Sequence, residues 1–144
     1  LHRRRHSFPT RRSSDLIGAA FALAGCIETG KPHENPTGAE DFAAYCAGCH
    51  GASGAGDGEI AADLTKKPAN LTTLSKRHKG EFPTTKVMAQ IWGYTGKKGS
   101  GVMPDFGPLL EGETVPYDGG DGIETPTPIR LVQLAEYLKT IQVK

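Results

Sequence analysis

Apolar side chains recur at helical spacing in three stretches of the chain. In residues 128–141 they fall at i, i+3, i+4 and i+7, which predicts an amphipathic helix with a buried apolar stripe. The stripe consists of Leu131, Leu134, Ala135, Leu138 and Ile141. Thr127 is the expected N-cap of this helix, with Pro128 at its first position.

The two other stretches lie at residues 37–46 and 84–92. The first begins with Thr37-Gly-Ala-Glu40, a capping box in which the threonine hydroxyl and the glutamate carboxylate satisfy free backbone N–H groups at a helix start. The second carries apolar side chains on one helical face, and Met88 among them is expected to pack in the core.

The composition is poor in material for a hydrophobic core. Hydrophobic residues make up 37% of the 144, below the roughly 45–50% of an average domain, and 19 glycines and 10 prolines are present. The length allows one domain, or one small domain with appendages. No apolar run reaches the roughly 18 residues of a transmembrane helix. Such a chain needs something besides its own side chains to fill a core.

Residues 1–16 differ from the rest of the chain, with five arginines against one acidic residue. Residues 6–16 read HSFPTRRSSDL, which resembles the in-frame translation of a sequencing-library adapter. We therefore exclude residues 1–16 from fold reasoning as non-native. The alternative is the basic n-region of a signal peptide, which the charge alone would also fit.

Residues 17–25 form a short run of small and apolar residues, typical of the end of a signal peptide. The run leads into Leu23-Ala-Gly-Cys26, which resembles a bacterial lipobox and predicts a lipid anchor at Cys26 on a membrane surface. Ordinary secretory cleavage nearby is the alternative. Both predict export to the periplasm or to the outer face of the cytoplasmic membrane, with residues 26–36 as a flexible linker.

The formal net charge of +1 depends on the N-terminal segment, because residues 26–144 carry a net charge of −3. Within them the net charge is −6 over residues 26–65, +7 over residues 66–98 and −4 over residues 99–144. This balance argues against a nucleic-acid-binding protein. The basic middle predicts steering toward an acidic protein partner, with a solvated lysine face as the alternative.

The strongest chemical signal is Cys46-Ala-Gly-Cys49-His50, a C-x-x-C-H motif. Two thiols at this spacing can each form a thioether with one vinyl group of a haem, and the next residue can place its imidazole on the iron. Such attachment takes place outside the cytoplasm, in agreement with the export signal. A covalently held haem would also supply the core that the composition lacks.

Three other interpretations of the cysteine pair fit the sequence less well. A thioredoxin-like redox motif needs a preceding strand in a βαβ pattern, and the chain shows neither. A zinc site needs a second pair of ligands, and no cysteine follows Cys49. A structural disulfide between these positions would leave His50 unexplained.

With a helix leading into C-x-x-C-H and a C-terminal amphipathic helix, the chain resembles the class I c-type cytochromes over roughly residues 37–142. The resemblance implies an all-α cytochrome c fold of about 3–5 helices around one covalently attached haem c, with long Gly/Pro-rich loops. This domain would span residues 37–144. His50 and a methionine far downstream would ligate the two faces of the iron.

Two methionines are available for this role. Met88 lies on the apolar face of a predicted helix, whereas Met103 lies in a loop and precedes Pro104, which disfavours helix there. Met103 is therefore the expected sixth ligand. The resemblance also implies that a proline carbonyl, here that of Pro68, accepts the N–H of His50 and fixes its tautomer. An ordinary loop proline is the alternative.

Residues 108–126 depart from the minimal pattern of the family, and we expect an extended loop there. The acids and glycines of residues 117–124 look faintly calcium-like but lack EF-hand spacing, so a solvated turn is favoured. Trp92 and Tyr94 could bond a haem propionate, although core packing is the favoured role of Trp92.

These features predict a one-electron carrier rather than an enzyme. With His50 and Met103 both on the iron, the protein would cycle between Fe(II) and Fe(III) in a bacterial respiratory chain. The expected partners are a quinol–cytochrome c reductase, a terminal oxidase or a dehydrogenase, besides the membrane surface at Cys26, and no nucleic acid. Two alternatives stay open: a five-coordinate haem domain that binds a small gas, and a haem subunit of a larger oxidoreductase.

Overall fold

The computed structural model describes residues 35–94 and 103–144, which belong to one compact unit, Lys31–Lys144. The adapter-like segment, the leader remnant, the lipid anchor at Cys26 and most of the linker fall within residues 1–34, outside the described residues. Those expectations stay predictions. No helix in the described ranges is long and apolar enough to cross a membrane.

Helix α1 (Gly38–Tyr45) begins at the predicted capping box. The Thr37 hydroxyl accepts the backbone N–H of Glu40 at 3.3 Å, and the Glu40 carboxylate accepts the backbone N–H of Thr37 at 2.7 Å. One residue after α1 the chain enters a single turn, α2 (Ala47–His50). The box therefore fixes the start of the helix that delivers the C-x-x-C-H motif.

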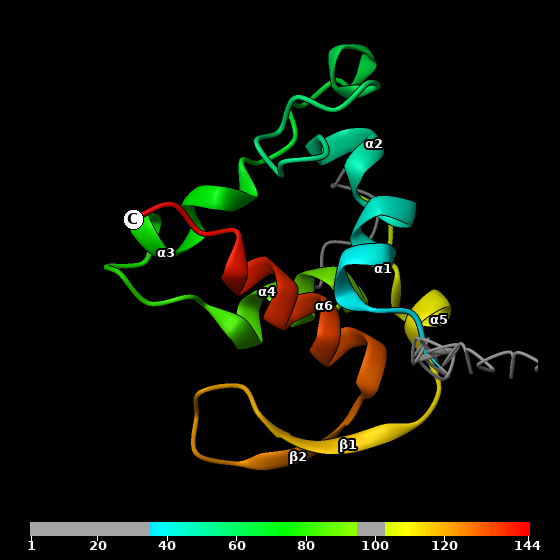
Figure 1. Ribbon diagram of the computed structural model, residues 1–144, viewed down its shortest axis with the longest axis vertical. Helices are drawn as coiled ribbons and strands as arrows, with labels where there is room; N and C mark the ends of the chain where they lie inside the picture. Colours follow the sequence, from blue (N-terminus) through cyan, green and yellow to red (C-terminus); the bar gives the residue numbers. More distant parts are fainter. Residues whose placement is uncertain (1–34, 95–102) are drawn as a thin grey trace, which may run out of the picture. The chain divides into compact units, whose positions relative to one another are not determined.

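The C-terminal helix α6 (Ile129–Thr140) packs against α1, as Figure 1 shows. Gly38 lies at the contact, where a Cβ atom would come within 2.0 Å of the backbone oxygen of Gln133. Beside it, the ring centroids of Phe42 and Tyr137 lie 5.3 Å apart. Because Gly38 has no side chain, the two helix backbones can touch, and α1 reaches the apolar stripe of α6.

Helix α4 (Thr84–Trp92) has the predicted bounds and also packs on α6. Met88 and Ile91 on its inner face are buried, which confirms the packing role expected of Met88. The buried apolar side chains of the described ranges form one cluster: Phe42, Met88, Ile91, Leu110, Leu131, Leu134, Ala135 and Leu138.

A buried ion pair joins α1 to α6. Asp41 is 1% exposed, and its carboxylate accepts hydrogen bonds from Nε and Nη2 of Arg130. Nη1 of the same guanidinium donates to the backbone carbonyl of Leu109 at 2.6 Å, in α5 (Gly107–Leu110). Burying a carboxylate without a partner would be strongly destabilising. Arg130 removes this cost by neutralising Asp41, and the same side chain links three helices.

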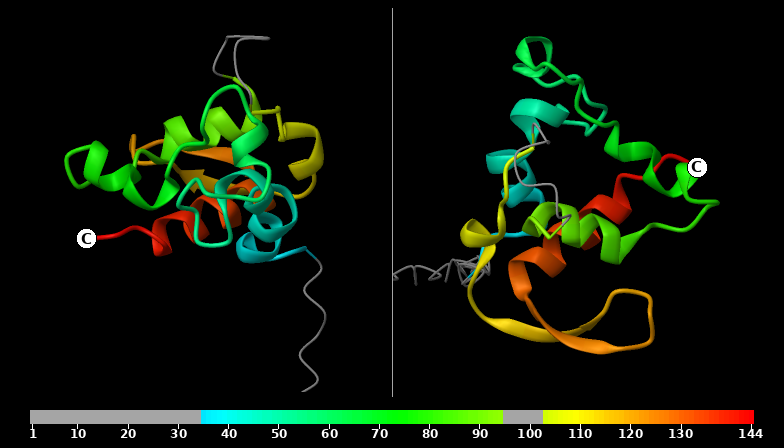
Figure 2. Two further views of the ribbon diagram at one scale, coloured as in Figure 1. Left: turned by 90° about the horizontal axis from the view of Figure 1, so that it is seen from above. Right: turned by 180° about the vertical axis from the view of Figure 1, so that it is seen from behind.

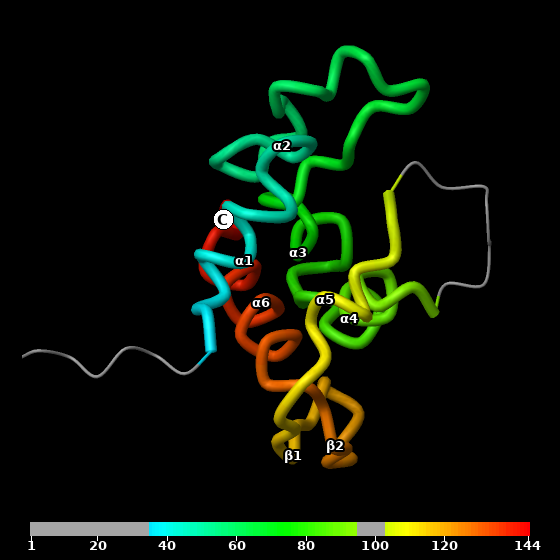
Figure 3. Tube along the Cα trace, turned by 90° about the vertical axis from the view of Figure 1, so that its right-hand side faces the viewer, coloured from blue at the N-terminus to red at the C-terminus, as the bar shows by residue number. Residues whose placement is uncertain are grey.

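Residues 108–126 do not form the expected extended loop, so the described fold is not purely α-helical. Strands β1 (Thr114–Asp118) and β2 (Glu124–Pro128) pair antiparallel, with Thr114 opposite Pro128. Figure 3 shows this hairpin beyond the ends of α5 and α6. Threonine and valine favour extended backbone in these strands, whereas three prolines within them obscure the signal in the sequence.

The turn of the hairpin is closed by Asp118. Its Oδ1 accepts the backbone N–H groups of Gly120, Asp121 and Gly122 at 2.8–3.0 Å. These hydrogen bonds lower the pKa of the carboxyl group. The acids therefore hold a solvated turn, as favoured from the sequence. Within the described ranges, no group of three or more His, Cys, Asp or Glu side chains could hold a metal ion.

Two further expectations about helices are wrong in detail. The described ranges contain six α-helical segments, because α2, α3 (Leu74–Arg77) and α5 are single turns that leave no periodic signal in the sequence. Thr127 is not the N-cap of α6, since Pro128 stands at that position. The Thr127 hydroxyl instead donates to the carbonyl of Thr125 at 2.9 Å within β2.

A long loop connects α2 to α4 and contains the 3-10 turns η1 (Ala61–Asp63) and η2 (Leu71–Thr73) followed by α3. Figure 2 shows this loop leaving α2 and returning beside the C-terminus. There the backbone N–H of Val143 donates to the carbonyl of Thr72 at 2.8 Å. The tail of the chain thus holds the loop that forms one wall of the main cavity.

Candidate functional site

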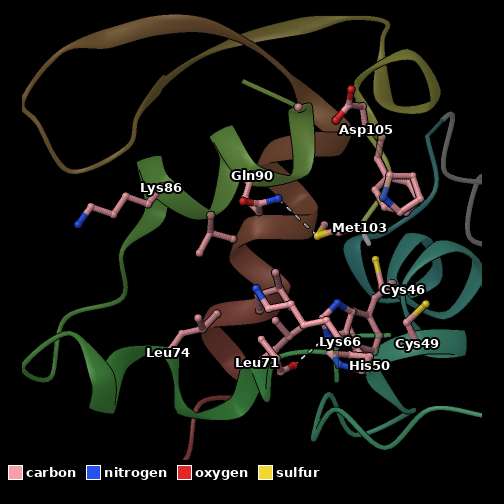
Figure 4. Close-up of a pocket in the computed structure, with 18 of the residues that line it drawn as sticks. Cys46, Cys49, His50, Lys66, Leu71, Leu74, Lys86, Gln90, Met103 and Asp105 are labelled. Atoms are coloured by element: carbon pink, nitrogen blue, oxygen red, sulfur yellow. Dashed lines mark hydrogen bonds between the residues drawn. The ribbon is translucent and has the colours of Figure 1, made fainter. Parts of the chain in front are cut away.

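A cavity of about 890 Å³ lies between α2, the long loop and α4. This volume falls within the roughly 300–1,000 Å³ of small-molecule and cofactor sites. Cys46, Cys49, His50 and Met103 all line it, as Figure 4 shows. The fold therefore brings together the four side chains that the sequence singled out for one site, although Met103 lies far from the others along the chain.

The two cysteines of the motif are half-buried free thiols. Burial, and next the negative charge of Asp41, raise the pKa of the Cys46 thiol to about 11. Redox-active thiols of the thioredoxin type need the opposite, a pKa lowered toward neutrality. The environment of Cys46 is thus that of a thiol which is not activated as a redox nucleophile.

The imidazole of His50 is oriented by a backbone carbonyl. Its Nδ1 lies 2.9 Å from the carbonyl oxygen of Ala69. A carbonyl oxygen can only accept, so Nδ1 carries the proton, and Nε2 is left as the ring nitrogen with a lone pair. This arrangement is common for histidines that bind a metal, because it fixes the tautomer and makes the ligand more basic.

The expected acceptor, the carbonyl of Pro68, is wrong by one residue. The Pro68 carbonyl lies against Gly56 instead, where a Cβ atom would come within 2.6 Å of its oxygen. Gly56 has a φ of +86°, which favours glycine on conformational grounds as well. The next carbonyl, that of Ala69, also lies near Gly56, with its oxygen 3.3 Å from the same Cβ position, and it is the one that His50 contacts. Pro68 itself lines the cavity.

Met103 lies on the side of the cavity across from His50 in Figure 4. Its side chain is half-buried against the core, and its Sδ lies 4.0 Å from Nε2 of Gln90 on α4. Met88 does not line the cavity, because it packs on α6. Of the two methionines, Met103 is the one whose sulfur is available to a molecule in this site.

The polar lining contains residues that sequence reasoning missed. Gln90 and His78 both line the cavity. Gln90 follows Val87 and Lys86 at helical spacing, so the periodicity of residues 84–92 could have placed it on the cavity face of α4. His78 lies in the loop and left no such signal; its Nδ1 contacts the Leu74 carbonyl at 2.9 Å.

The two aromatic residues considered for propionate binding do not line the cavity. The Trp92 ring stacks on Tyr94 with 6.2 Å between centroids, and Tyr94 is 76% exposed. Three lysines lie at the cavity instead: Lys66, Lys67 and Lys86. The cavity lining therefore includes three lysines and one aspartate, Asp105, and neither of these aromatic rings.

The donor set fits a haem. Two thiols stand beside an imidazole whose Nε2 lone pair is free, and a thioether lies across the cavity among apolar side chains. Nitrogen and thioether donors suit iron, and two protein donors are enough when a porphyrin supplies the others.

A comparison with protein families finds a match over more than half of the chain. The family described as cytochrome c oxidase, cbb3-type, subunit III matches residues 33–115. The matched stretch contains the C-x-x-C-H motif, Ala69 and Met103, and ends within β1. No curated protein and no solved structure matches the chain.

Proposed function

The chain belongs to the family of cytochrome c oxidase, cbb3-type, subunit III, a c-type cytochrome domain, and from this premise we propose that it carries single electrons on one covalently bound haem c. His50 and Met103 would be the two axial ligands. The observation that carries this proposal is the single cavity lined by Cys46, Cys49, His50 and Met103.

Each residue has a distinct role in this proposal. Cys46 and Cys49 hold the haem through thioether bonds, and the haem iron supplies the Fe(II)/Fe(III) couple. His50, whose tautomer is fixed by Ala69, presents Nε2 to the iron. Met103 presents a thioether, which favours Fe(II) and raises the reduction potential relative to a second histidine. With both positions held by the chain, no site is open for a substrate.

The charge around the cavity supports a particular kind of partner. Lys66, Lys67 and Lys86 line the cavity, and all belong to the segment with a net charge of +7. Lysines near the site of electron exit steer association with an acidic surface. We infer a redox partner with an acidic docking face, such as a quinol–cytochrome c reductase, a terminal oxidase or a dehydrogenase, outside the cytoplasm.

Membership of an oxidase complex is the second candidate function. It is favoured by the family match, whose description names an oxidase subunit. In that case the domain would receive electrons and pass them within its own assembly. Purification from mild detergent separates the two: a free carrier elutes alone, whereas a subunit elutes with haem-containing partner chains.

Covalent attachment is tested by expressing the chain, with an export signal, in a bacterium that matures c-type cytochromes. We expect one haem per chain that stays with the polypeptide after denaturation and extraction with acidic acetone. Cys46→Ser combined with Cys49→Ser should abolish this retention. Cys26→Ser is the matched control and should retain the haem. Extraction of the haem from the unmodified protein would refute the proposal.

A further inference from the structure

We propose that Gln90 is a positioning residue for the Met103 thioether and sets the reduction potential through it. This inference rests on the proposed function, in which the Met103 sulfur binds iron. Nε2 of Gln90 lies 4.0 Å from Sδ of Met103, and the contact is drawn as a dashed line in Figure 4. An amide N–H is a donor and a thioether sulfur is a weak acceptor, so the pair can form a hydrogen bond.

The position of Gln90 on α4 supports a role at the cavity rather than in the core. Met88 and Ile91 on the same helix are buried in the core cluster, whereas Gln90 lines the cavity and is otherwise exposed. Replacing the Gln90 side chain therefore removes no core packing. A purely structural residue at this exposed position would have little effect on stability and none on the reduction potential.

The contact can act on the sulfur in two ways. It restrains the Met103 side chain, whose three rotatable bonds otherwise allow several positions for the sulfur. It also withdraws electron density from the sulfur, which makes the thioether a weaker donor to iron. Fe(III) needs electron donation more than Fe(II) does, so the hydrogen bond favours the reduced state and raises the potential. Hydrogen bonding to ligands is an established means by which proteins tune haem potentials.

The test compares the purified holoprotein with Gln90→Met and Gln90→Leu, which remove the donor and keep similar bulk. Thr85→Ala is the matched control, because Thr85 is exposed on the same helix and contacts the Gly119 carbonyl rather than the cavity. Three quantities are measured: the reduction potential, the weak red absorption band of thioether-bound Fe(III), and the rate at which added imidazole displaces the thioether.

We expect both Gln90 variants to shift the ratio of oxidised to reduced protein at a fixed potential about twofold to tenfold toward the oxidised form. A tenfold change corresponds to about 59 mV for a one-electron couple. The band should move or broaden and imidazole exchange should change in rate, while Thr85→Ala leaves all three unchanged.

Equal values in the unmodified protein and both Gln90 variants, with the band present, would overturn the role of Gln90 and leave the proposed ligation intact. An equal shift in Thr85→Ala would also overturn it, because the effect would then come from the helix as a whole. Absence of the band from the unmodified protein would instead refute Met103 ligation, and the role of Gln90 with it.

Discussion

Nδ1 of His50 and the backbone carbonyl of Ala69 lie 2.9 Å apart, although 19 residues separate them in the sequence. This contact ties the C-x-x-C-H motif to the long loop that forms one wall of the cavity. The position of the carbonyl depends on a close backbone contact, since the neighbouring Pro68 carbonyl packs on Gly56, where no side chain fits.

Gly56→Ala should therefore disturb the proximal histidine from a distance. The new Cβ would clash with the Pro68 carbonyl and displace the segment that holds Ala69. We expect a loss of stability above the roughly 1–2 kcal/mol of left-handed strain alone, together with a changed reduction potential. Denaturant unfolding and a redox titration of the holoprotein measure the two effects.

Gly80→Ala is the matched control for this substitution. Gly80 also has a positive φ, of +94°, but a Cβ there would meet nothing within 4 Å. Gly80→Ala should lower the free energy of unfolding by the cost of backbone strain alone and should leave the reduction potential unchanged. If both variants gave the same unfolding free energy and the same potential, the packing of Pro68 on Gly56 would have no part in positioning Ala69.

Arg130→Met should be strongly destabilising because it leaves the buried Asp41 carboxylate without its partner. The expected cost is about 3–5 kcal/mol in the free energy of unfolding. Adding Asp41→Asn should recover part of the loss, because the unpaired charge is then gone. Lys139→Met breaks an exposed pair with Glu136 and should cost less than about 1 kcal/mol. If Arg130→Met and Lys139→Met lowered the free energy of unfolding by the same amount, the role given to the Asp41–Arg130 pair would be contradicted.

The attachment of the hairpin to α6 should weaken in alkali. Tyr117 donates to Glu136, and Lys139 contacts both. Burial and then the hydrogen bond to Glu136 raise the pKa of Tyr117, and the contacts to Glu136 and Tyr117 outweigh burial in raising the pKa of Lys139. The folded state thus favours both protonated forms. Tyr117 and Lys139 therefore contribute fully to stability below the pKa values that they have in the unfolded chain, about 10. This contribution is lost as the pH rises through their higher pKa values in the folded protein.

Amide exchange of β1, compared between pH 7 and pH 10.5 after correction for intrinsic rates, measures this effect. Protection should fall at the higher pH by less than about 1 kcal/mol, as befits partly exposed groups. Tyr117→Phe should remove most of the difference. Unchanged protection in the unmodified protein across this range would show that the three side chains do not hold the hairpin.

Electron transfer to an acidic partner should slow as salt is added. The second-order rate constant is measured by stopped flow against an acidic redox protein at increasing ionic strength, because exposed charges are screened over roughly 10 Å at 0.1 M salt. Lys66→Glu with Lys67→Glu should lower both the rate and its salt dependence, whereas Lys144→Glu, which does not line the cavity, should change both less. A rate independent of salt would contradict the steering role of these lysines.

The sequence predicted the elements that carry periodic or motif signals. The capping box at Thr37 and the helix over residues 84–92 were both placed correctly, because each depends on local hydrogen bonding or on one buried face. The sequence does not predict the hairpin, because its prolines contradict a strand pattern. Threonine occurs both at helix starts and in strands, so its presence before Pro128 does not distinguish an N-cap from the end of β2.

Within the site, the sequence identified the residues with distinctive chemistry and missed those that act through position. C-x-x-C-H stands out in any context, and a methionine in a loop becomes distinctive in a chain that carries this motif. The acceptor for His50 is a backbone carbonyl, which every residue has, so a shift from Pro68 to Ala69 leaves no trace in the sequence. Gln90 is likewise an ordinary residue of an exposed helix face until the fold places Met103 beside it.

The central claim, a haem held by His50 and Met103 in an electron carrier, is tested most directly by absorption spectroscopy of the holoprotein and of Met103→Ala. The oxidised unmodified protein should show the weak red band of thioether-bound Fe(III), and the reduced protein should not bind CO. Met103→Ala should lose the band and bind CO, whereas Met88→Leu, altered only in the core, should behave as the unmodified protein. A missing band together with CO binding by the unmodified protein would contradict the claim and establish a five-coordinate, gas-binding haem.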